Sequence, residues 1–162
     1  MVEKIPLSVV VITKNEESNI EDCLHSVNDW ADEIVIVDDE STDKTREIAH
    51  RFTDKVLLKK MENEGQHRNW AYAQAKNEWV LSLDADEKVS DELKQEISAA
   101  IRETEFVGFS IPLRNFIGNY WVRHSGWYPA SKLRLFKKDK FRYEEVEVHP
   151  RAFLDGKEGH LT

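Results

Sequence analysis

Trp79-Val80-Leu81-Ser82-Leu83-Asp84-Ala85-Asp86-Glu87 is the stretch that decides the fold of this chain. It begins as a short, nearly continuous apolar run, which is typical of a strand covered on both faces of a sheet. It ends in three acidic residues within four positions. Because alternate side chains of an extended chain share a face, Asp84 and Asp86 should point the same way and Ala85 the other. The stretch therefore predicts a central strand with two carboxylates at its carboxyl end.

These two carboxylates would lie roughly 6–7 Å apart and would repel each other by about 2–3 kcal/mol at an effective dielectric constant near 20. A divalent cation or a set of hydroxyl donors would relieve the repulsion. Mg²⁺ and Mn²⁺ favour such sparse oxygen sites, in which phosphate oxygens and water complete the shell. Acidic pairs also occur in solvated turns after strands, here before a helix that Ser90 would cap. The working hypothesis is a metal–diphosphate site.

The composition is that of a soluble globular domain. The 162 residues are 40% hydrophobic and 33% charged, which suits one domain with a sizeable core. The net charge of −8 argues against a nucleic-acid partner. Residues 132–142 form a local basic cluster, which could meet a phosphorylated acceptor or an anionic membrane surface, or be a solvated face. Cys23 is the single cysteine, so no internal disulfide is expected, and its position predicts a core residue.

The chain shows no signal-peptide pattern and no window near the ~20 apolar residues that span a bilayer, so we expect a cytoplasmic protein. Apolar, β-branched runs predict three strands before the one quoted above, at residues 7–12, 33–37 and 55–58. Helices are predicted after Ser18, with Glu21 completing a capping box, and after Thr42. This alternation predicts an α/β fold with a mainly parallel sheet, in which ligands bind beyond the carboxyl ends of the strands.

Polar clusters fall at three of these predicted strand ends, at residues 13–16, 38–43 and 84–87. Since the carboxyl ends of parallel strands meet at one edge, the clusters should converge on one crevice. A helix predicted to run to about Lys76 carries Arg68 in its first turns, where backbone N–H groups and the helix dipole favour anions. Arg68 could hold a diphosphate through two hydrogen bonds, or it could pair with a nearby acid on the surface.

The composition of the sequence changes from residue 105, where β-branched and aromatic residues are interrupted by glycine and proline. We expect a small antiparallel addition here, with strands at residues 107–113, 133–136 and 141–143. Residues 115–130 are predicted to form a long loop that carries Trp121, Trp127 and Tyr128. These rings could offer apolar faces to an acceptor sugar, or they could pack the loop onto the sheet.

Four motifs in this order resemble the family 2 glycosyltransferases of the GT-A fold. They are VVVITKNE at residues 9–16, VDDESTD at 37–43, the pair Arg68-Asn69, and LDADE at 83–87. Residues 126–136 and the pair Val148-His149 resemble a narrower branch, the lipopolysaccharide core β-glucosyltransferases. The resemblance implies a single three-layer α/β/α domain over residues 1–162. Its nucleotide-binding part would reach to about residue 104, and its acceptor-side part, residues 105–162, would be C-terminally short.

The resemblance also implies a role for each motif. Thr13 and Glu16 would line the pocket of the base. Asp39 would accept a hydrogen bond from the base or ribose, and Asp84 would face the ribose. Asp86 would bind Mn²⁺ or Mg²⁺ that bridges the diphosphate. Further contacts with the nucleotide-sugar are implied for Asn15, Asp38, Arg68 and Ala85.

Inversion at the anomeric carbon needs a base that takes the proton of the attacking hydroxyl. Related enzymes often have an acid directly after the late Val-His pair, where this chain has Pro150. Alternation along a strand would place Glu145 and Glu147 on one face, so we favour Glu147, then Glu145, as the base. His149 lies on that same face and could approach the metal, or it could be a surface or packing residue.

The implied function is the metal-dependent, inverting transfer of a sugar, with a UDP-linked hexose as the expected donor. The acceptor would be a saccharide or glycolipid of envelope polysaccharide or lipopolysaccharide synthesis, with a peripheral contact to the inner face of the cytoplasmic membrane. The alternative is a nucleotide-sugar-binding module without turnover, which an assay of donor hydrolysis would distinguish. A phosphatase with Asp84 as nucleophile is disfavoured because its Asp-x-Asp would follow the first strand. A nucleotidyltransferase would need a glycine-rich phosphate loop.

Overall fold

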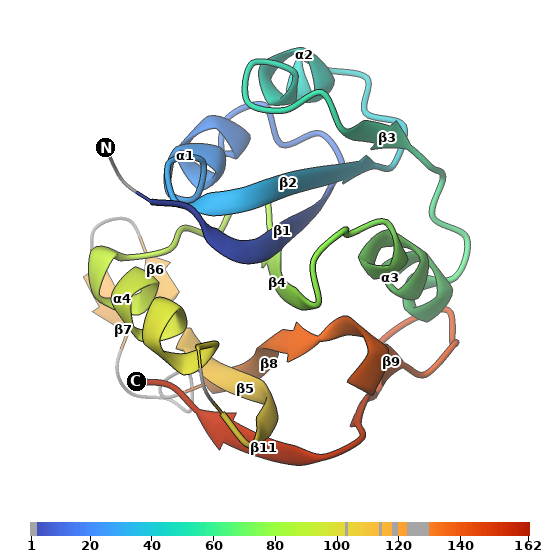
Figure 1. The fold of residues 1–162 in the computed structure, drawn as a ribbon. Helices are drawn as coiled ribbons and strands as arrows, with labels where there is room; N and C mark the ends of the chain where they lie inside the picture. The colour runs from blue at the N-terminus through green and yellow to red at the C-terminus, as the bar shows by residue number, and fades with distance from the viewer. Residues whose placement is uncertain (1–2, 103, 114, 118–119, 123–129) are drawn as a thin grey trace.

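A seven-stranded sheet forms the centre of the computed structural model, which describes residues 3–102, 104–113, 115–117, 120–122 and 130–162 (Figure 1). Its strands are β1 (Ile5–Thr13), β2 (Ala31–Asp38), β3 (Val56–Leu58), β4 (Trp79–Asp84), β5 (Phe106–Leu113), β8 (Ala130–Lys137) and β11 (Lys157–His160). They lie in the order β11-β5-β8-β4-β1-β2-β3, and β8 runs antiparallel to both of its neighbours. The other neighbouring pairs are parallel, which confirms the prediction of a mainly parallel sheet.

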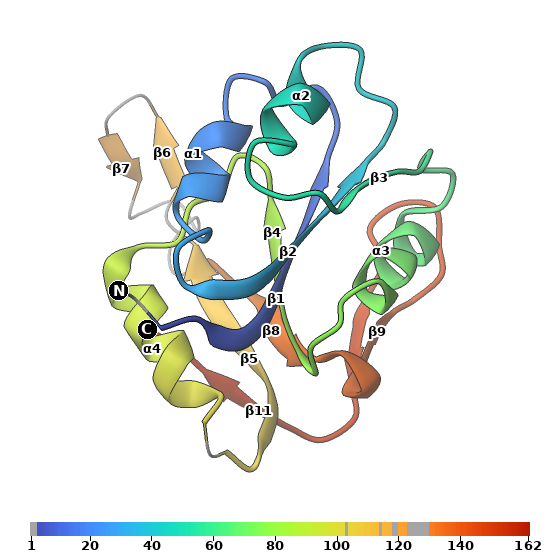
Figure 2. The same cartoon turned by 45° about the horizontal axis from the view of Figure 1, so that its top comes forward.

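Helices cover both faces of this sheet (Figures 1 and 2). They are α1 (Ile20–His25), α2 (Thr45–Ala49), α3 (Glu64–Ala73) and α4 (Asp91–Ala100). Alternation along β1 separates two cores: Val9 and Val11 pack with α1, α2 and α4, whereas Val10 and Ile12 pack with α3. The three-layer prediction is thereby confirmed. Among the described residues, no helix has the length and apolarity to cross a bilayer.

Two short antiparallel pairs lie outside the central sheet. They are β6 (Asn115–Ile117) with β7 (Tyr120–Val122), and β9 (Phe141–Tyr143) with β10 (Ala152–Leu154). A 3₁₀ turn, Lys138–Lys140, connects β8 to β9. The prediction of one long loop over residues 115–130 was wrong where β6 and β7 form. The strands predicted at residues 107–113 and 133–136 belong to the central sheet, because β8 takes the place beside β4 and β5 pairs with β8.

The start of α1 differs from the sequence prediction. The helix begins at Ile20, with Asn19 at the N-cap position and no side-chain cap, rather than after Ser18. The carbonyl oxygen of Glu16 already accepts the N–H groups of Asn19 and Ile20, at 3.0 and 2.9 Å, so a turn precedes the helix. The predicted Ser90 cap of α4 is confirmed.

The start of α2 also differs. The helix begins at Thr45, whose N–H donates to the carboxylate of Asp43 at 2.9 Å. Thr42 does not cap it, because Lys44 occupies the N-cap position and the Thr42 hydroxyl points to the side-chain oxygen of Asn15, at 3.4 Å. The Thr42 N–H donates to the same oxygen at 2.8 Å. This bond joins the loop after β2 to the loop after β1. Thr42, which was predicted to cap a helix, therefore links two loops near the candidate site.

Candidate active site

The carboxyl ends of β4, β1 and β2 stop at the same edge of the sheet. Ile12 on β1 lies opposite Asp84 on β4, and the next residue, Thr13, lies opposite Asp38 on β2. The polar residues that follow these strands are thus brought together, as expected for parallel strands. Asn15 has a positive φ of 51°, a conformation that is uncommon for residues other than glycine and clusters at functional sites.

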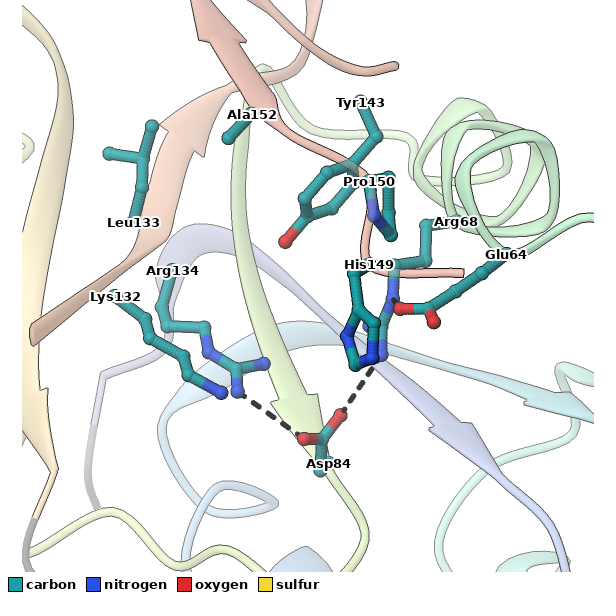
Figure 3. Close-up of a pocket in the computed structure, with 10 residues that line it drawn as sticks. All are labelled: Glu64, Arg68, Asp84, Lys132, Leu133, Arg134, Tyr143, His149, Pro150 and Ala152. Carbon is teal, nitrogen blue, oxygen red and sulfur yellow. Dashed lines mark hydrogen bonds and ion pairs between the residues drawn. The ribbon is translucent and has the colours of Figure 1, made fainter. Parts of the chain in front are cut away.

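A pocket of about 340 Å³ opens beside the end of β4 (Figure 3). Its walls come from β4, α3, β8 and the chain that follows β9. The described residues that line it are Glu64, Arg68, Asp84, Lys132, Leu133, Arg134, Tyr143, His149, Pro150 and Ala152. A cavity of this size is at the lower end of the range for small-molecule sites, and its cations suit an anionic ligand.

Asp84 lies in this pocket between two guanidinium groups, which approach it from opposite sides in Figure 3. Arg134 Nη2 is 3.3 Å from Asp84 Oδ2, and Arg68 Nη2 is 3.7 Å from Asp84 Oδ1. Arg68 Nε also donates to Glu64 at 3.1 Å, which fixes the side chain along α3. Guanidinium groups are the side chains best suited to bidentate binding of phosphate oxygens.

Glu87 completes this charged network. Its Oε1 accepts the N–H of Asp84 at 2.7 Å, and its Oε2 accepts a hydrogen bond from Arg134 Nη2 at 3.2 Å. Burial raises the pKa of Glu87 above its ordinary value, and the charge of Arg134 opposes that rise. Glu87 therefore holds the turn after β4 and shares the Arg134 guanidinium with Asp84.

Hydrogen bonds between side chains and backbone join the loops after β1 and β2. The N–H of Asn15 donates to Ser41 Oγ, and the N–H of Glu16 donates to Thr45 Oγ1, each at 2.8 Å. Asp38 is fully buried, and its carboxylate accepts the N–H of Ser41 at 2.8 Å. These hydrogen bonds hold the two loops together without a ligand.

Unused hydrogen-bonding capacity remains at the ends of β1 and β2 and on α3. Asp39 Oδ1 accepts the N–H of Met61 at 2.9 Å, whereas Asp39 Oδ2 lies 4.0 Å from Lys14 Nζ. The hydroxyl of Thr13 and both ring nitrogens of His67 are buried with no partner in the described part of the chain. Burial lowers the pKa of His67, so its ring is neutral at pH 7. Buried polar atoms are normally paired, so Thr13 and His67 are exceptions in the described part of the chain.

The family follows from the sequence as a whole, since residues 8–153 match the family model described as "Glycosyl transferase family 2". The chain belongs to glycosyl transferase family 2. It is 39% identical over 110 residues to an uncharacterized glycosyltransferase of Rickettsia bellii, covering 66% of this chain and 37% of that protein. It is 28% identical over 167 residues to the lipopolysaccharide core biosynthesis glycosyltransferase LpsC of Rhizobium meliloti, covering 99% and 62%. The chain thus spans less than two thirds of either relative.

Solved structures share the fold of this family 2 chain. TarS of S. aureus in complex with UDP-GlcNAc superposes with a TM-score of 0.64 at 21% identity, covering 98% of this chain and 59% of that one. Glucosyl-3-phosphoglycerate synthase from Mycobacterium tuberculosis, in complex with Mn²⁺, UDP and glucosyl-3-phosphoglycerate, gives 0.53 at 20% identity, covering 65% and 43%. These likenesses confirm the predicted GT-A fold.

Three of the residues singled out by the family 2 motifs line the pocket, namely Arg68, Asp84 and His149. Asp86 is exposed on the turn beyond Asp84, and Ala85 is buried in the core on the side of α1. In the described ranges, no three His, Cys, Asp or Glu side chains come close enough together to hold a metal ion. A divalent cation at Asp86 would therefore need ligands from a bound diphosphate or water.

Glu145 and Glu147 lie on an irregular segment, so the argument that strand alternation places them on one face was wrong. β9 ends at Tyr143, and both glutamate side chains are exposed. Carbonyl oxygens of this segment instead accept the first N–H groups of α3, at 3.1 Å from the nitrogens of Glu64 and Gly65. The segment after Tyr143 therefore pairs with the start of α3 and not with a neighbouring strand, and its extended conformation ends there.

α3 and the chain after β9 are joined along two turns of the helix. The side chain of Asn69 accepts the N–H of Tyr143 at 2.8 Å and donates to its carbonyl oxygen at 2.9 Å. A Cβ on Gly65 would lie 1.8 Å from the carbonyl oxygen of Glu144, so the approach requires glycine. In contrast to the sequence prediction, the first N–H groups of α3 are not open to an anion. Arg68 must act through its own guanidinium.

The predicted acceptor residues cannot all be placed. Trp127 and Tyr128 lie outside the described residues, and Trp121 is described only as part of the backbone of β7. Arg134, by contrast, is a pocket residue that the sequence prediction included only as part of the basic cluster at residues 132–142. The pairing of β8 with β5 is irregular between Leu133 and Leu135, so simple alternation does not place Arg134, which reaches the site because β8 lies beside β4.

Cys23 of α1 is expected to resist thiol reagents. It is fully buried, and its Sγ lies 3.7 Å from the carbonyl oxygen of Asp84. Burial, reinforced by the nearby acids after β4, raises the pKa of Cys23 from 9.0 to about 12. The thiolate fraction at pH 8 should then fall by about 1,000-fold. The reagent DTNB should label one thiol in urea and none in the folded protein; rapid labelling without urea would contradict this placement of α1.

Proposed function

We propose that this chain carries out the metal-dependent, inverting transfer of a sugar from a nucleotide-sugar, a UDP-linked hexose, to a saccharide or glycolipid acceptor. The observation that carries the proposal is the position of Asp84 between Arg68 and Arg134, at the carboxyl edge of the parallel strands. The complex of TarS with UDP-GlcNAc supports the donor class. The similarity to LpsC supports a product in lipopolysaccharide or envelope polysaccharide synthesis.

The donor would lie along the edge of the sheet from β2 to β4. Thr13 and Asp39 retain hydrogen-bonding capacity for the base and ribose. Asp38 is turned toward Ser41, so we assign it to holding the loop rather than to touching the base. The proposed contacts with the nucleotide-sugar are Thr13, Asn15, Glu16, Asp39, Arg68 and Asp84, whereas the buried Asp38 and Ala85 are proposed to support these contacts without touching the donor.

Asp86 and His149 would hold a Mn²⁺ or Mg²⁺ ion together with oxygens of a bound diphosphate and water. Asp86 offers an exposed carboxylate and His149 an exposed imidazole, and His149 shares the pocket with Asp84. The cation would supply a Lewis acid for the charge that develops on the departing diphosphate. Arg68 would donate hydrogen bonds to the same departing group. The synthase complex with Mn²⁺ and UDP supports this choice of metal.

Glu147, and after it Glu145, are proposed as the base that accepts the proton of the attacking hydroxyl. Both are exposed, and their segment leads directly to His149 in the pocket wall. Glu144 is a weaker candidate because its ion pair with Arg151, at 3.1 Å, lowers its pKa. A carboxylate held in this way is a poorer acceptor of a proton.

The acceptor would enter from the side of β8 and the chain after β9, within a single domain over residues 1–162. Residues 1–104 would supply most of the donor site, and residues 105–162 would supply the acceptor side together with Arg134. The proposed acceptor contacts are Trp121, Trp127 and Tyr128. We place this activity in the cytoplasm, with a peripheral contact to the inner face of the cytoplasmic membrane.

Titration of UDP in the presence of Mn²⁺ tests the proposal. The wild type should bind, and Asp86→Ala should weaken binding by on the order of 100-fold, because a ligand of the cation is lost. Asp54→Ala removes an exposed carboxylate on the connection between α2 and β3, so it should bind like the wild type. Undiminished binding by Asp86→Ala, or no binding of UDP, GDP or ADP by the wild type, would refute the proposal. Release of glucose from UDP-glucose would separate turnover from binding alone.

A further inference from the structure

Arg134 is a buried cation whose hydrogen-bonding capacity is only partly used. Its side chain is 6% exposed, and its Nη2 contacts Asp84 and Glu87 at 3.3 and 3.2 Å. Its Nε is buried and has no partner among the described residues. A guanidinium offers five N–H donors, and buried donors are normally satisfied in native proteins. Arg134 is therefore placed to bind a ligand that enters the pocket.

Asp84 is a loosely held counter-ion between Arg134 and Arg68. The two ion pairs, at 3.3 and 3.7 Å, are longer than the 2.7–2.9 Å of charge-assisted hydrogen bonds. The side chain of Asp84 is 37% exposed, on the side of the pocket. Figure 3 shows the guanidinium groups reaching Asp84 from opposite walls. The carboxylate therefore occupies a position between two cations that another anion could take.

A divalent cation near Asp84 changes this balance. If the carboxylate turns to the cation, the two guanidinium groups lose their shared counter-ion and repel the incoming positive charge. Glu64 and Glu87 remain as partners of Arg68 and Arg134, but each is already paired in the donor-free site. An anion with several oxygens, placed between the guanidinium groups, would remove the repulsion and use their free donors.

We propose that Arg134 is a second diphosphate-binding residue beside Arg68, and that Asp84 holds the place of the diphosphate until the donor arrives. When the donor binds, both guanidinium groups exchange Asp84 for the diphosphate, and Asp84 becomes free to face the cation or the ribose. The assignment rests on the proposed function and adds to it that the cation and the diphosphate help each other to bind. Cation and diphosphate should each bind poorly without the other.

The experiment compares Arg134→Met, Arg134→Lys and Asp84→Asn with the wild type, in titrations of UDP and uridine. Arg134→Met should weaken UDP binding with Mn²⁺ by on the order of 10–100-fold, because hydrogen bonds to a charged group are lost, and should leave uridine binding unchanged within about twofold. Arg134→Lys should restore part of the loss. Lys137→Met is the matched control, since it removes a cation from the other end of β8, where Lys137 pairs with Glu78.

The variant Asp84→Asn tests whether Asp84 occupies the diphosphate position in the donor-free site or only supports the fold. With EDTA present, this variant should bind UDP several-fold more tightly than the wild type, and addition of Mn²⁺ should improve its affinity less than it improves that of the wild type, because Asp86 still offers a carboxylate to the cation. The assignment is overturned if Arg134→Met binds UDP as the wild type does, if it loses UDP and uridine equally, or if Asp84→Asn gains nothing in EDTA. Should Arg134→Met fail to fold, Arg134→Lys and Asp84→Asn decide. A wild type that binds no nucleoside diphosphate would refute the proposed function itself.

Discussion

Gly65→Ala is expected to lower the free energy of unfolding by about 3 kcal/mol. The new Cβ would lie 1.8 Å from the carbonyl oxygen of Glu144 and 2.8 Å from its carbonyl carbon. These are backbone atoms, which cannot rotate away as a side chain can, so the segment after β9 must leave α3. The hydrogen bonds from the N–H groups of Glu64 and Gly65 to that segment would be lost with it. In an exposed helix the same change would raise the free energy of unfolding by about 1 kcal/mol. A decrease in Gly65→Ala would therefore show that the segment after β9 packs against this position.

Urea denaturation measures this effect, with Gln66→Ala as the control. Gln66 is the exposed neighbour on the same helix, and its replacement should change stability by less than about 0.5 kcal/mol. UDP affinity should fall together with stability in Gly65→Ala, because Arg68 lies one turn further along α3. Equal stability of Gly65→Ala and the wild type would contradict the close packing of this segment on α3.

Phe136→Ala is expected to destabilise the fold by about 4 kcal/mol. Phe136 is fully buried on β8, stacks on Phe141 with 3.8 Å between ring centroids, and meets Tyr72 edge to face at 5.0 Å. Truncation would remove both aromatic contacts and leave a cavity that the sheet cannot close. Since Phe136 belongs to the same core cluster as Leu133 and Tyr143, which line the pocket, the cavity would open beside the pocket. The melting temperature should fall by about 8–16 °C.

Phe153→Ala serves as the control for the second prediction. This phenylalanine, on β10, is 38% exposed, and its ring packs under the guanidinium groups of Arg142 and Arg151. Its loss should cost less than about 1 kcal/mol. A calorimetric scan of both variants checks the pair. Similar melting temperatures for the two would show that Phe136 does not hold the core together.

The sequence predicted the parts of the site that depend on local pattern. Buried parallel strands leave continuous apolar runs, so the strand ends carrying Thr13, Asp38 and Asp84 could be located, and with them the crevice. Helix starts were less predictable, because capping residues can be used elsewhere. Thr42 has the hydroxyl of a cap, but that hydroxyl lies 3.4 Å from the side-chain oxygen of Asn15, which is far away in the sequence.

Residues placed by long-range pairing could not be predicted. Arg134 reaches Asp84 only because β8 pairs with β4, and no periodicity within β8 reveals its neighbour. The alternation proposed for Glu145 and Glu147 failed for the same reason, since the helix end that captures their segment lies about eighty residues earlier in the chain. In both cases the two partners are far apart in the sequence, and only the folded structure shows that they meet.

β8 joins β4 only late in synthesis. The edge of β4 pairs with residues 135–137, roughly fifty residues after β4 itself has been made. At 5–20 residues per second, a ribosome would take about 3–10 s to supply them. During that time an apolar strand presents open N–H and C=O groups, which is a template for pairing with other chains. The nascent protein should therefore depend on chaperones, or on slow initiation, until β4, which already pairs with β1, acquires its second neighbour.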